Sequence, residues 1–207
     1  MKISYAVTVC NEFIEIQRLM RILLEHKRLR DNIVVLYDCK NGDPEIENFL
    51  RSHSVNGEFM WHKAEFDGHF ADWKNKLTSF CTGDYIFQID ADEIPHTKLL
   101  ELLPEIIEEN IECDVIMVPR INTVDGLTEE HVRKWGWHIN ERGWVNWPDE
   151  QWRIYKNNSN LKWVNKVHER IDGYKTWTHL PIKEEFALYH PKTIERQERQ
   201  NEYYNKL

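Results

Sequence analysis

The chain has 207 residues, which is enough for one well-buried domain and too few for two large ones. With 41% hydrophobic and 12% aromatic residues it is expected to fold, and this composition excludes an intrinsically disordered chain. The 27 basic and 35 acidic residues give a net charge of −8 without a dense run of Lys or Arg, so nucleic acid is not expected as the main partner.

Nothing in the hydrophobic pattern predicts a membrane anchor or a secretion signal. No window approaches the roughly 20 apolar residues of a membrane-spanning helix, and the first residues do not form a signal peptide. Cys10, Cys39, Cys81 and Cys113 are scattered singly, which is typical of reduced thiols and not of a zinc site or a disulfide scaffold. We therefore expect a soluble protein of the cytoplasm.

The first 120 residues alternate between apolar runs typical of strands and segments with helical periodicity. This alternation predicts an α/β fold with a mostly parallel sheet that helices cover on both faces. One helix is expected to be broken or kinked near Pro104, because proline lacks the amide hydrogen that a helix needs. We expect strands at residues 3–9, 33–37, 59–62, 85–89 and 115–118, and helices at residues 12–25, 44–50, 70–80 and 97–109.

The character of the sequence changes from Asn122 onward. Seven of the nine tryptophans fall there, and helical runs are scarce before Ile194. We expect short strands and long loops laid over one end of the sheet, closed by a helix at residues 194–205. Residues 1–207 would then form a single domain with two halves, at 1–120 and 121–207.

The segment 85–93 carries the strongest chemical signal, because a short apolar run ends there in Asp90, Asp92 and Glu93. Strand residues alternate in direction, so Asp90 and Asp92 are expected to project to the same side at the carboxyl end of a buried strand. Open α/β sheets bind their ligands at this end, and carboxylate oxygens suit Mg²⁺ or Mn²⁺. An acidic turn that only ends the strand is the simpler alternative.

Several motifs follow one another along the chain: residues 7–12 (VTVCNE), the strand end at Asp38, residues 70–75 (FADWKN) and residues 82–93 (TGDYIFQIDADE). This ordered set resembles family 2 glycosyltransferases, and the resemblance covers nearly the whole chain. Residues 147–156 (WPDEQWRIYK) and 167–169 (VHE) are similar to a bacterial subgroup that includes lipopolysaccharide-core glucosyltransferases. The resemblance implies the GT-A fold and the transfer of a sugar, with inversion, from a nucleotide diphosphate donor to a glycan or other hydroxyl acceptor. It also implies that residues 1–120 form the nucleotide-sugar-binding half and residues 121–207 the acceptor-binding half.

The resemblance also implies a donor site that depends on Mn²⁺ or Mg²⁺ and contains the DXD motif of residues 90–92. Asp92 would bind the metal directly, and Asp90 would contact the ribose or a water molecule on the metal. His168 matches the histidine that many GT-A enzymes use as a further metal ligand, although a hydrogen-bonded strand histidine is the alternative. The remaining contacts to the donor would come from Asn11, Glu12, Asp38, Lys74 and Asn75.

The sequence leaves two features of this donor site undecided, the roles of Lys74 and Asn75 and the identity of the nucleotide. Lys74 and Asn75 are explained equally well as a solvated helix face. Asp38 is followed by Cys39 and Lys40, where a second acidic residue and a Ser or Thr are common in the family. The resemblance therefore does not select among UDP-, GDP- and dTDP-linked sugars.

The base that accepts the proton of the acceptor hydroxyl is expected in the pair Asp149 and Glu150. These residues occupy the place of the family's catalytic acidic pair, and Asp149 is the first choice. A carboxylate that activates attack from the face opposite the leaving group gives inversion. Without the resemblance, residues that cap a helix or a turn would be the preferred interpretation.

Other polar and aromatic residues have two interpretations each. His190 is either an alternative metal ligand or a hydrogen-bonded structural histidine. Arg153 and Lys156 are either phosphate contacts or, as the safer interpretation, solvated strand residues. Some tryptophans are expected to stack on an acceptor sugar, whereas most belong to the core.

Three classes of function fit these observations. The preferred hypothesis is a metal-dependent inverting glycosyltransferase. The second is a GT-A domain that binds a nucleotide or a glycan without turnover. The third is a nucleotidyltransferase, which is the least favoured because residues 10–13 (CNEF) do not form the Gly-rich, basic phosphate loop of that class.

Overall fold

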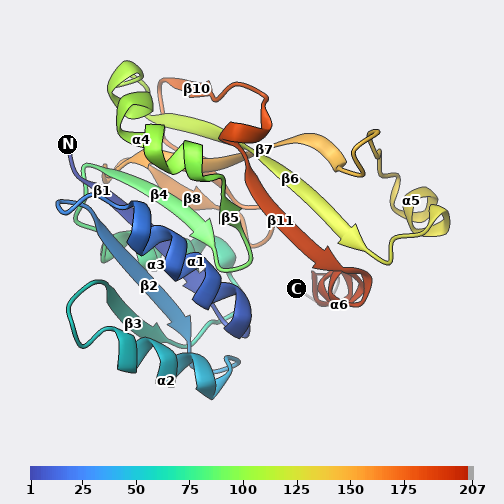
Figure 1. Ribbon diagram of the computed structural model, residues 1–207, viewed down its shortest axis with the longest axis horizontal. Coiled ribbons are helices and arrows are strands. Elements are labelled where there is room, and N and C mark those ends of the chain that lie inside the picture. The colour runs from blue at the N-terminus through green and yellow to red at the C-terminus, as the bar shows by residue number, and fades with distance from the viewer. Residues whose placement is uncertain (205–207) are drawn as a thin grey trace.

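In a computed structural model of the chain, residues 1–204 are described. Within them, one nine-stranded sheet runs in the order β3-β2-β1-β4-β7-β6-β11-β5, with β10 paired to β6, and β8 and β9 form a separate two-stranded sheet (Figure 1). The strands are β1 (Ile3–Val9), β2 (Asn32–Asp38), β3 (Met60–Ala64), β4 (Tyr85–Asp90), β5 (Ile94–Pro95), β6 (Val115–Asp125), β7 (Val145–Lys156), β8 (Lys162–Val164), β9 (Arg170–Asp172), β10 (Trp177–His179) and β11 (Leu188–Thr193).

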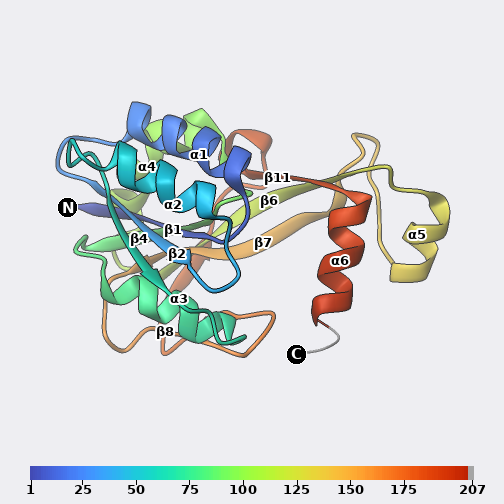
Figure 2. The same ribbon diagram turned by 90° about the horizontal axis from the view of Figure 1, so that it is seen from below.

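Helices cover both faces of this sheet. Figure 2 shows α1, α2 and α4 on one face, and α3 with β8 on the opposite face. The helices are α1 (Phe13–His26), α2 (Pro44–His53), α3 (Phe70–Ser79), α4 (Thr97–Glu109), α5 (Glu129–Trp135) and α6 (Ile194–Tyr204), with a short 3₁₀ turn, η1 (Glu184–Phe186).

Alternation of side chains along the strands produces two hydrophobic cores. Tyr5 and Val7 of β1 join the core under α1, α2 and α4, whereas Ala6 between them joins the core under α3. In β4, Phe87 belongs to the first core and Ile86 to the second. Because both faces are buried, β1, β2 and β4 consist almost entirely of apolar residues, which is the pattern of a covered parallel sheet.

The predicted α/β fold with a mostly parallel sheet is confirmed for the first part of the chain. Strands β1, β2, β3 and β4 pair in parallel, and their bounds agree with the predicted ranges to within two residues. The predicted break near Pro104 is wrong, because α4 runs without interruption from Thr97 to Glu109 with Pro104 inside it. The five buried side chains of α4 hold it against the sheet and offset the missing hydrogen bond.

The second part of the chain differs from the prediction. Long strands β6 and β7 and the strand β11 extend the main sheet, instead of forming short strands over one end of it. β7 lies antiparallel between β4 and β6, and its register with β6 shifts between Ile116 and Met117, where Arg153 is the extra residue of a bulge in β7. α5, which was not predicted, lies at the distal end of β6 (Figure 1).

Three expectations concern single features of the chain. The C-terminal helix is found as α6, which ends at Tyr204; the expected last residue, Asn205, lies outside the described residues. All four cysteines fall within residues 1–204 and are free thiols, as expected. Among the described residues, no helix is both long and apolar enough to cross a membrane.

Candidate active site

Polar side chains gather where β1, β2 and β4 end, at the carboxyl edge of the parallel strands. Asp90 is the last residue of β4 and lies on the face that α3 covers. The Thr8 hydroxyl on the neighbouring strand β1 donates to Asp90 Oδ1 at 2.9 Å. Arg153 Nη2 of β7 and Lys74 Nζ of α3 approach Asp90 Oδ2 at 2.8 Å and 3.6 Å. Three elements therefore fix the carboxylate of Asp90.

A buried chain of alternating charges connects Asp90 with Asp149. The Glu93 carboxylate is fully buried, with Oε1 at 2.5 Å from Arg153 Nη2 and 3.0 Å from Arg120 Nη1. Arg120 in turn contacts Asp149 Oδ2 at 2.7 Å through Nη2. Each arginine lies between two carboxylates, so two guanidinium groups and the Lys74 ammonium at Asp90 offset the charge of three carboxylates.

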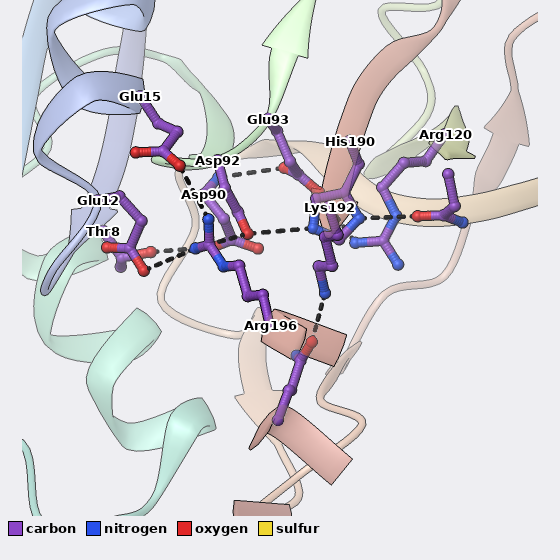
Figure 3. A network of polar contacts seen from close by, with 12 residues as sticks. Thr8, Glu12, Glu15, Asp90, Asp92, Glu93, Arg120, His190, Lys192 and Arg196 are labelled. Carbon is purple, nitrogen blue, oxygen red and sulfur yellow. Dashed lines mark hydrogen bonds and ion pairs between the residues drawn. The ribbon is translucent and has the colours of Figure 1, made fainter. Parts of the chain in front are cut away.

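Asp92 lies in the turn after β4, beyond the end of the strand, and has different partners from Asp90. His190 Nε2 of β11 is 3.2 Å from Asp92 Oδ2, and Arg196 Nη2 of α6 is also 3.2 Å from that atom. The other ring nitrogen of His190, Nδ1, is 2.7 Å from Asn122 Oδ1. Figure 3 shows Asp90 and Asp92 side by side, with His190 and Arg196 approaching Asp92.

The surrounding cations keep both aspartates ionised. Burial alone would raise the pKa of Asp90, but Lys74 and Arg153 outweigh it and hold this pKa well below its usual value. Burial likewise opposes ionisation of Asp92, whereas His190 and Arg196 hold its pKa well below its usual value. The negative charge of Asp92 raises the pKa of Asp90, so the two carboxylates interact. The site therefore carries two carboxylates at neutral pH.

The loop after β1 contributes Glu12, while Asn11 beside it is exposed to solvent. Glu12 Oε2 accepts hydrogen bonds from the backbone amides of Cys10 and Asn11, and Glu12 Oε1 is 3.1 Å from Arg196 Nη2. Burial raises the pKa of Glu12, and the two amides and Arg196 offset only part of this increase. Glu12 thus joins the first loop of the site to α6.

Asp38, at the end of β2, is buried and holds the surrounding backbone. Its Oδ1 accepts hydrogen bonds from the amides of Lys40 at 3.0 Å and Phe66 at 3.1 Å, and its Oδ2 accepts one from Asn41 Nδ2 at 2.9 Å. Asp38 therefore fixes the loops at the edge of the site, and its contact with a nucleotide stays a prediction.

Lys74 and Asn75 are neighbours on α3 but point to different places. Lys74 is buried, with Nζ 2.6 Å from Glu169 Oε1, so the interpretation as a solvated helix face is wrong for this residue. Asn75 is turned toward β8, where its amide donates to the carbonyl of Trp163 and accepts from the amide of Trp163, both at 2.9 Å. The structure brings Lys74 to Asp90, whereas Asn75 holds β8 against α3.

Asp149 and Glu150 lie next to each other in β7 and face different partners. Asp149 Oδ2 accepts from Arg120 and Asn122, and Oδ1 accepts from Gln151 at 2.7 Å. Burial opposes ionisation of Asp149, but Arg120 and the amide donors outweigh it and lower its pKa. Glu150 Oε1 instead lies 3.4 Å from His179 Nδ1 of β10. Only Asp149 of this pair belongs to the charge network that reaches Asp90.

The two candidate histidines are placed differently. His190 contacts Asp92, as described above, whereas His168 is exposed and has its ring centroid 6.0 Å from that of Tyr204 in α6. Within residues 1–204, no group of three or more His, Cys, Asp or Glu is arranged to hold a metal ion. Asp92 and His190 are thus the only predicted metal ligands in mutual contact among the described residues.

Several residues of the site were not foreseen. Arg153 is 2% exposed, so its interpretation as a solvated strand residue is wrong. Arg153 is the extra residue of a bulge that breaks the strict alternation of β7, and bulges of this kind redirect side chains. The signal in the sequence for the burial of Arg153 was its position between Trp152 and Ile154. No local pattern in the sequence indicates that Glu93, Arg120 or Arg196 forms ion pairs at this site, because each of these ion pairs joins segments that are far apart in the chain.

Comparisons with known proteins identify the family and the fold of the chain. The family model described as "Glycosyl transferase family 2" matches residues 4–177. A search of curated protein sequences gives no match. The narrower similarity to lipopolysaccharide-core glucosyltransferases therefore stays a prediction.

Among solved structures, the crystal structure of S. aureus TarS residues 1–349 in complex with UDP-GlcNAc is similar, with a TM-score of 0.64 and 15% identity. It covers 93% of this chain and 59% of the TarS chain. The complex of TarS 1–349 with UDP has a TM-score of 0.61 at 14% identity, over 92% of this chain and 60% of that chain. The chain thus spans about three fifths of those TarS chains.

The structural similarity shows a shared fold, which confirms the predicted GT-A architecture. The family match extends over most of the chain and includes β1, β4 and β7, the strands that carry Thr8, Asp90 and Asp149. The chain belongs to glycosyl transferase family 2.

Proposed function

We propose that the protein is a metal-dependent inverting glycosyltransferase that moves a sugar from a nucleotide diphosphate donor to a hydroxyl acceptor. The observation that carries this proposal is the pair of ionised carboxylates, Asp90 and Asp92 (Figure 3), of which Asp90 is connected through Arg153, Glu93 and Arg120 to Asp149. A transfer site needs neutralised charge at the leaving group and a base at the acceptor. Asp92, with Asp90 beside it, is the candidate for the first role and Asp149 for the second, and this supports the proposal.

The residues around Asp92 fit a hard divalent cation. A carboxylate oxygen and an imidazole nitrogen are ligands that Mn²⁺ accepts, and Asp92 and His190 provide them in mutual contact. The guanidinium of Arg196 at the same carboxylate also indicates that this position favours positive charge. Asp92 would hold the cation, with Asp90 beside it and His190 or His168 as a further ligand. When bound, Mn²⁺ or Mg²⁺ would neutralise charge on the leaving diphosphate.

Asp149 is the proposed base. Its Oδ2 is occupied by Arg120 and Asn122, but Oδ1 receives only Gln151 and keeps lone-pair capacity for a proton. In the transfer, the acceptor oxygen forms a bond to the anomeric carbon, and the bond from that carbon to the diphosphate oxygen breaks. The diphosphate leaves with the electron pair, and the acceptor proton passes to Asp149. Attack from the opposite face inverts the configuration.

The donor is proposed to be a UDP-linked sugar. TarS, which shares the fold, is solved with UDP-GlcNAc and with UDP, and this supports UDP over GDP and dTDP. Asn11, Glu12 and Asp38 lie at the ends of β1 and β2, where this nucleotide would bind. Lys74 is proposed to contact the phosphates.

The acceptor is proposed to be a glycan of the lipopolysaccharide-core type, and the reaction would take place in the cytoplasm.

Two variants test the proposed function. Asp92→Ala is expected to abolish Mn²⁺-dependent binding of UDP-GlcNAc in calorimetry, because it removes the carboxylate that would hold the cation. Asp149→Asn is expected to bind this donor normally while the rate of UDP release falls by about 100-fold to 10,000-fold, the usual contribution of a positioned base. UDP release is measured with a panel of glycan acceptors.

Glu150→Gln is the matched control, because Glu150 is adjacent to Asp149 but faces His179. This variant is expected to keep most of the wild-type rate. Wild-type rates in both Asp92→Ala and Asp149→Asn would contradict the assignment. If the wild-type protein binds UDP-GlcNAc but releases no UDP under any condition, the result would favour a binding domain without turnover.

A further inference from the structure

Arg196, in the first turn of α6, lies among three carboxylates that come from other elements. Its Nη2 is 3.2 Å from Asp92 Oδ2 and 3.1 Å from Glu12 Oε1, and its Nη1 is 3.0 Å from Glu15 Oε1. Figure 3 shows the guanidinium reaching between α1 and the turn after β4. These three ion pairs attach α6 to the edge of the sheet at which the donor is proposed to bind.

Other polar contacts also reach α6: His131 Nε2 of α5 is 3.5 Å from Glu198 Oε1, and Lys192 of β11 donates a hydrogen bond to Gln200 Oε1. None of residues 194–204 is buried, so the helix contributes no side chain to the core. At its far end, Tyr204 has its ring centroid 5.8 Å from that of Phe70 and 6.0 Å from that of His168, and its hydroxyl accepts a hydrogen bond from Gln200 of the same helix. Figure 2 shows α6 standing apart from the layers of the sheet. An element with few buried apolar contacts opens at low free-energy cost, so its polar contacts decide its position.

The carboxylate of Asp92 is required for two different partners. Asp92 Oδ2 accepts Arg196, and Asp92 is also the residue proposed to hold the divalent cation. A guanidinium does not lose its proton at any physiological pH, so both partners carry positive charge and repel each other at short distance. The ion pair of Arg196 with Asp92 and the binding of a divalent cation to Asp92 therefore oppose each other.

We propose that Arg196 is an internal counter-ion that latches α6 over the donor site, and that a divalent cation releases this latch by displacing Arg196 from Asp92. The inference rests on the proposed function, because it takes the cation to bind at Asp92. Coupling between two equilibria is reciprocal. A docked α6 must weaken cation binding, and cation binding must loosen α6 to the same extent.

The first test measures Mn²⁺ binding by calorimetry without nucleotide, in the wild-type protein and in Arg196→Gln. The variant is expected to bind Mn²⁺ at least roughly 10-fold more tightly, within the range usual for coupled sites. Arg199→Gln is the matched control. It removes the same charge from an exposed position one turn further along α6, and it is expected to bind Mn²⁺ as the wild type does.

The second test follows amide hydrogen exchange over residues 194–204. In the wild-type protein, Mn²⁺ is expected to speed exchange in this segment. In Arg196→Gln, exchange should be fast already without Mn²⁺. Glu15→Gln, which weakens the latch without touching Asp92, should also speed exchange of α6.

Equal Mn²⁺ affinity of Arg196→Gln and the wild type, including no binding by either, would overturn the latch. Slower exchange of α6 on addition of Mn²⁺ would overturn it as well. The proposed function is judged separately, by UDP release and by donor binding in Asp92→Ala. If Asp92→Ala loses the donor while Arg196→Gln leaves Mn²⁺ affinity unchanged, the latch is refuted and the transferase assignment stands.

Discussion

Single residues at this site are held by charges that come from distant parts of the chain. Glu93, two arginines and two aspartates alternate along the network, and the arginines lie on β6 and β7. Burying such charges is costly unless each has a partner, so removal of one member leaves the others uncompensated. The network is therefore expected to be both a structural support and the scaffold of the proposed site.

Glu93→Gln tests the structural part of this account. Loss of the buried negative charge leaves Arg120 and Arg153 incompletely neutralised, so we expect the free energy of unfolding to fall by about 3 to 5 kcal/mol. The measurement is urea denaturation at neutral pH. Glu47→Gln is the control, because Glu47 also bridges two cations, Arg51 and Lys63, but does so at the surface. An equally small effect in both variants would refute the claim that the buried network stabilises the fold.

At the scale of elements, helix α3 serves both the site and the framework. Lys74 extends to Asp90 and Glu169, while the next residue, Asn75, makes two hydrogen bonds to the backbone of Trp163 in β8. Consecutive helical residues point about 100° apart, which is why two neighbours on α3 have different roles. Sequence alone assigns both residues to the donor pocket through the family resemblance, and the geometry supports this for Lys74 only.

Asn75→Ala is expected to destabilise the protein without weakening the donor site. The two lost hydrogen bonds leave the amide and carbonyl of Trp163 unpaired, which costs about 1 to 3 kcal/mol. Thermal unfolding measures this loss, and calorimetry with UDP-GlcNAc is expected to give an unchanged affinity. Lys76→Ala, at an exposed position one residue further along, is the control. If Asn75→Ala instead lost donor affinity at unchanged stability, Asn75 would belong to the donor pocket.

Element bounds in the first 120 residues could be predicted from local patterns. Each strand there is an apolar run between turn residues, and each helix repeats its apolar positions at 3.6-residue spacing. The continuity of α4 through Pro104 could not be predicted, because it depends on how the helix packs on the sheet. The extension of β6 beyond Val118, together with β7 and β11 as strands of the main sheet, was missed for a related reason. β6, β7 and β11 are stabilised by partners far away in sequence, which no local window contains.

At the scale of the whole molecule, the mixed sheet places the two halves of the proposed reaction side by side. Parallel strands β1, β2 and β4 end at the donor edge, and antiparallel β7 brings Asp149 and Arg153 to β4 from the second part of the chain. α6 then returns to the same edge through Arg196. Sequence motifs indicated Asp90, Asp92 and Asp149, but only the topology shows which charged residues surround them.

The central claim is that the carboxylates at the end of β4 form a cation-dependent nucleotide site. The most direct measurement is a calorimetric titration of the full chain with UDP, GDP and dTDP, first with Mn²⁺ and then with EDTA. The account predicts that UDP binds in the presence of Mn²⁺, that EDTA abolishes this binding, and that Asp92→Ala does not bind UDP. Absence of binding by any of the three nucleotides to the folded wild-type protein would contradict the account, as would equal binding of UDP by Asp92→Ala.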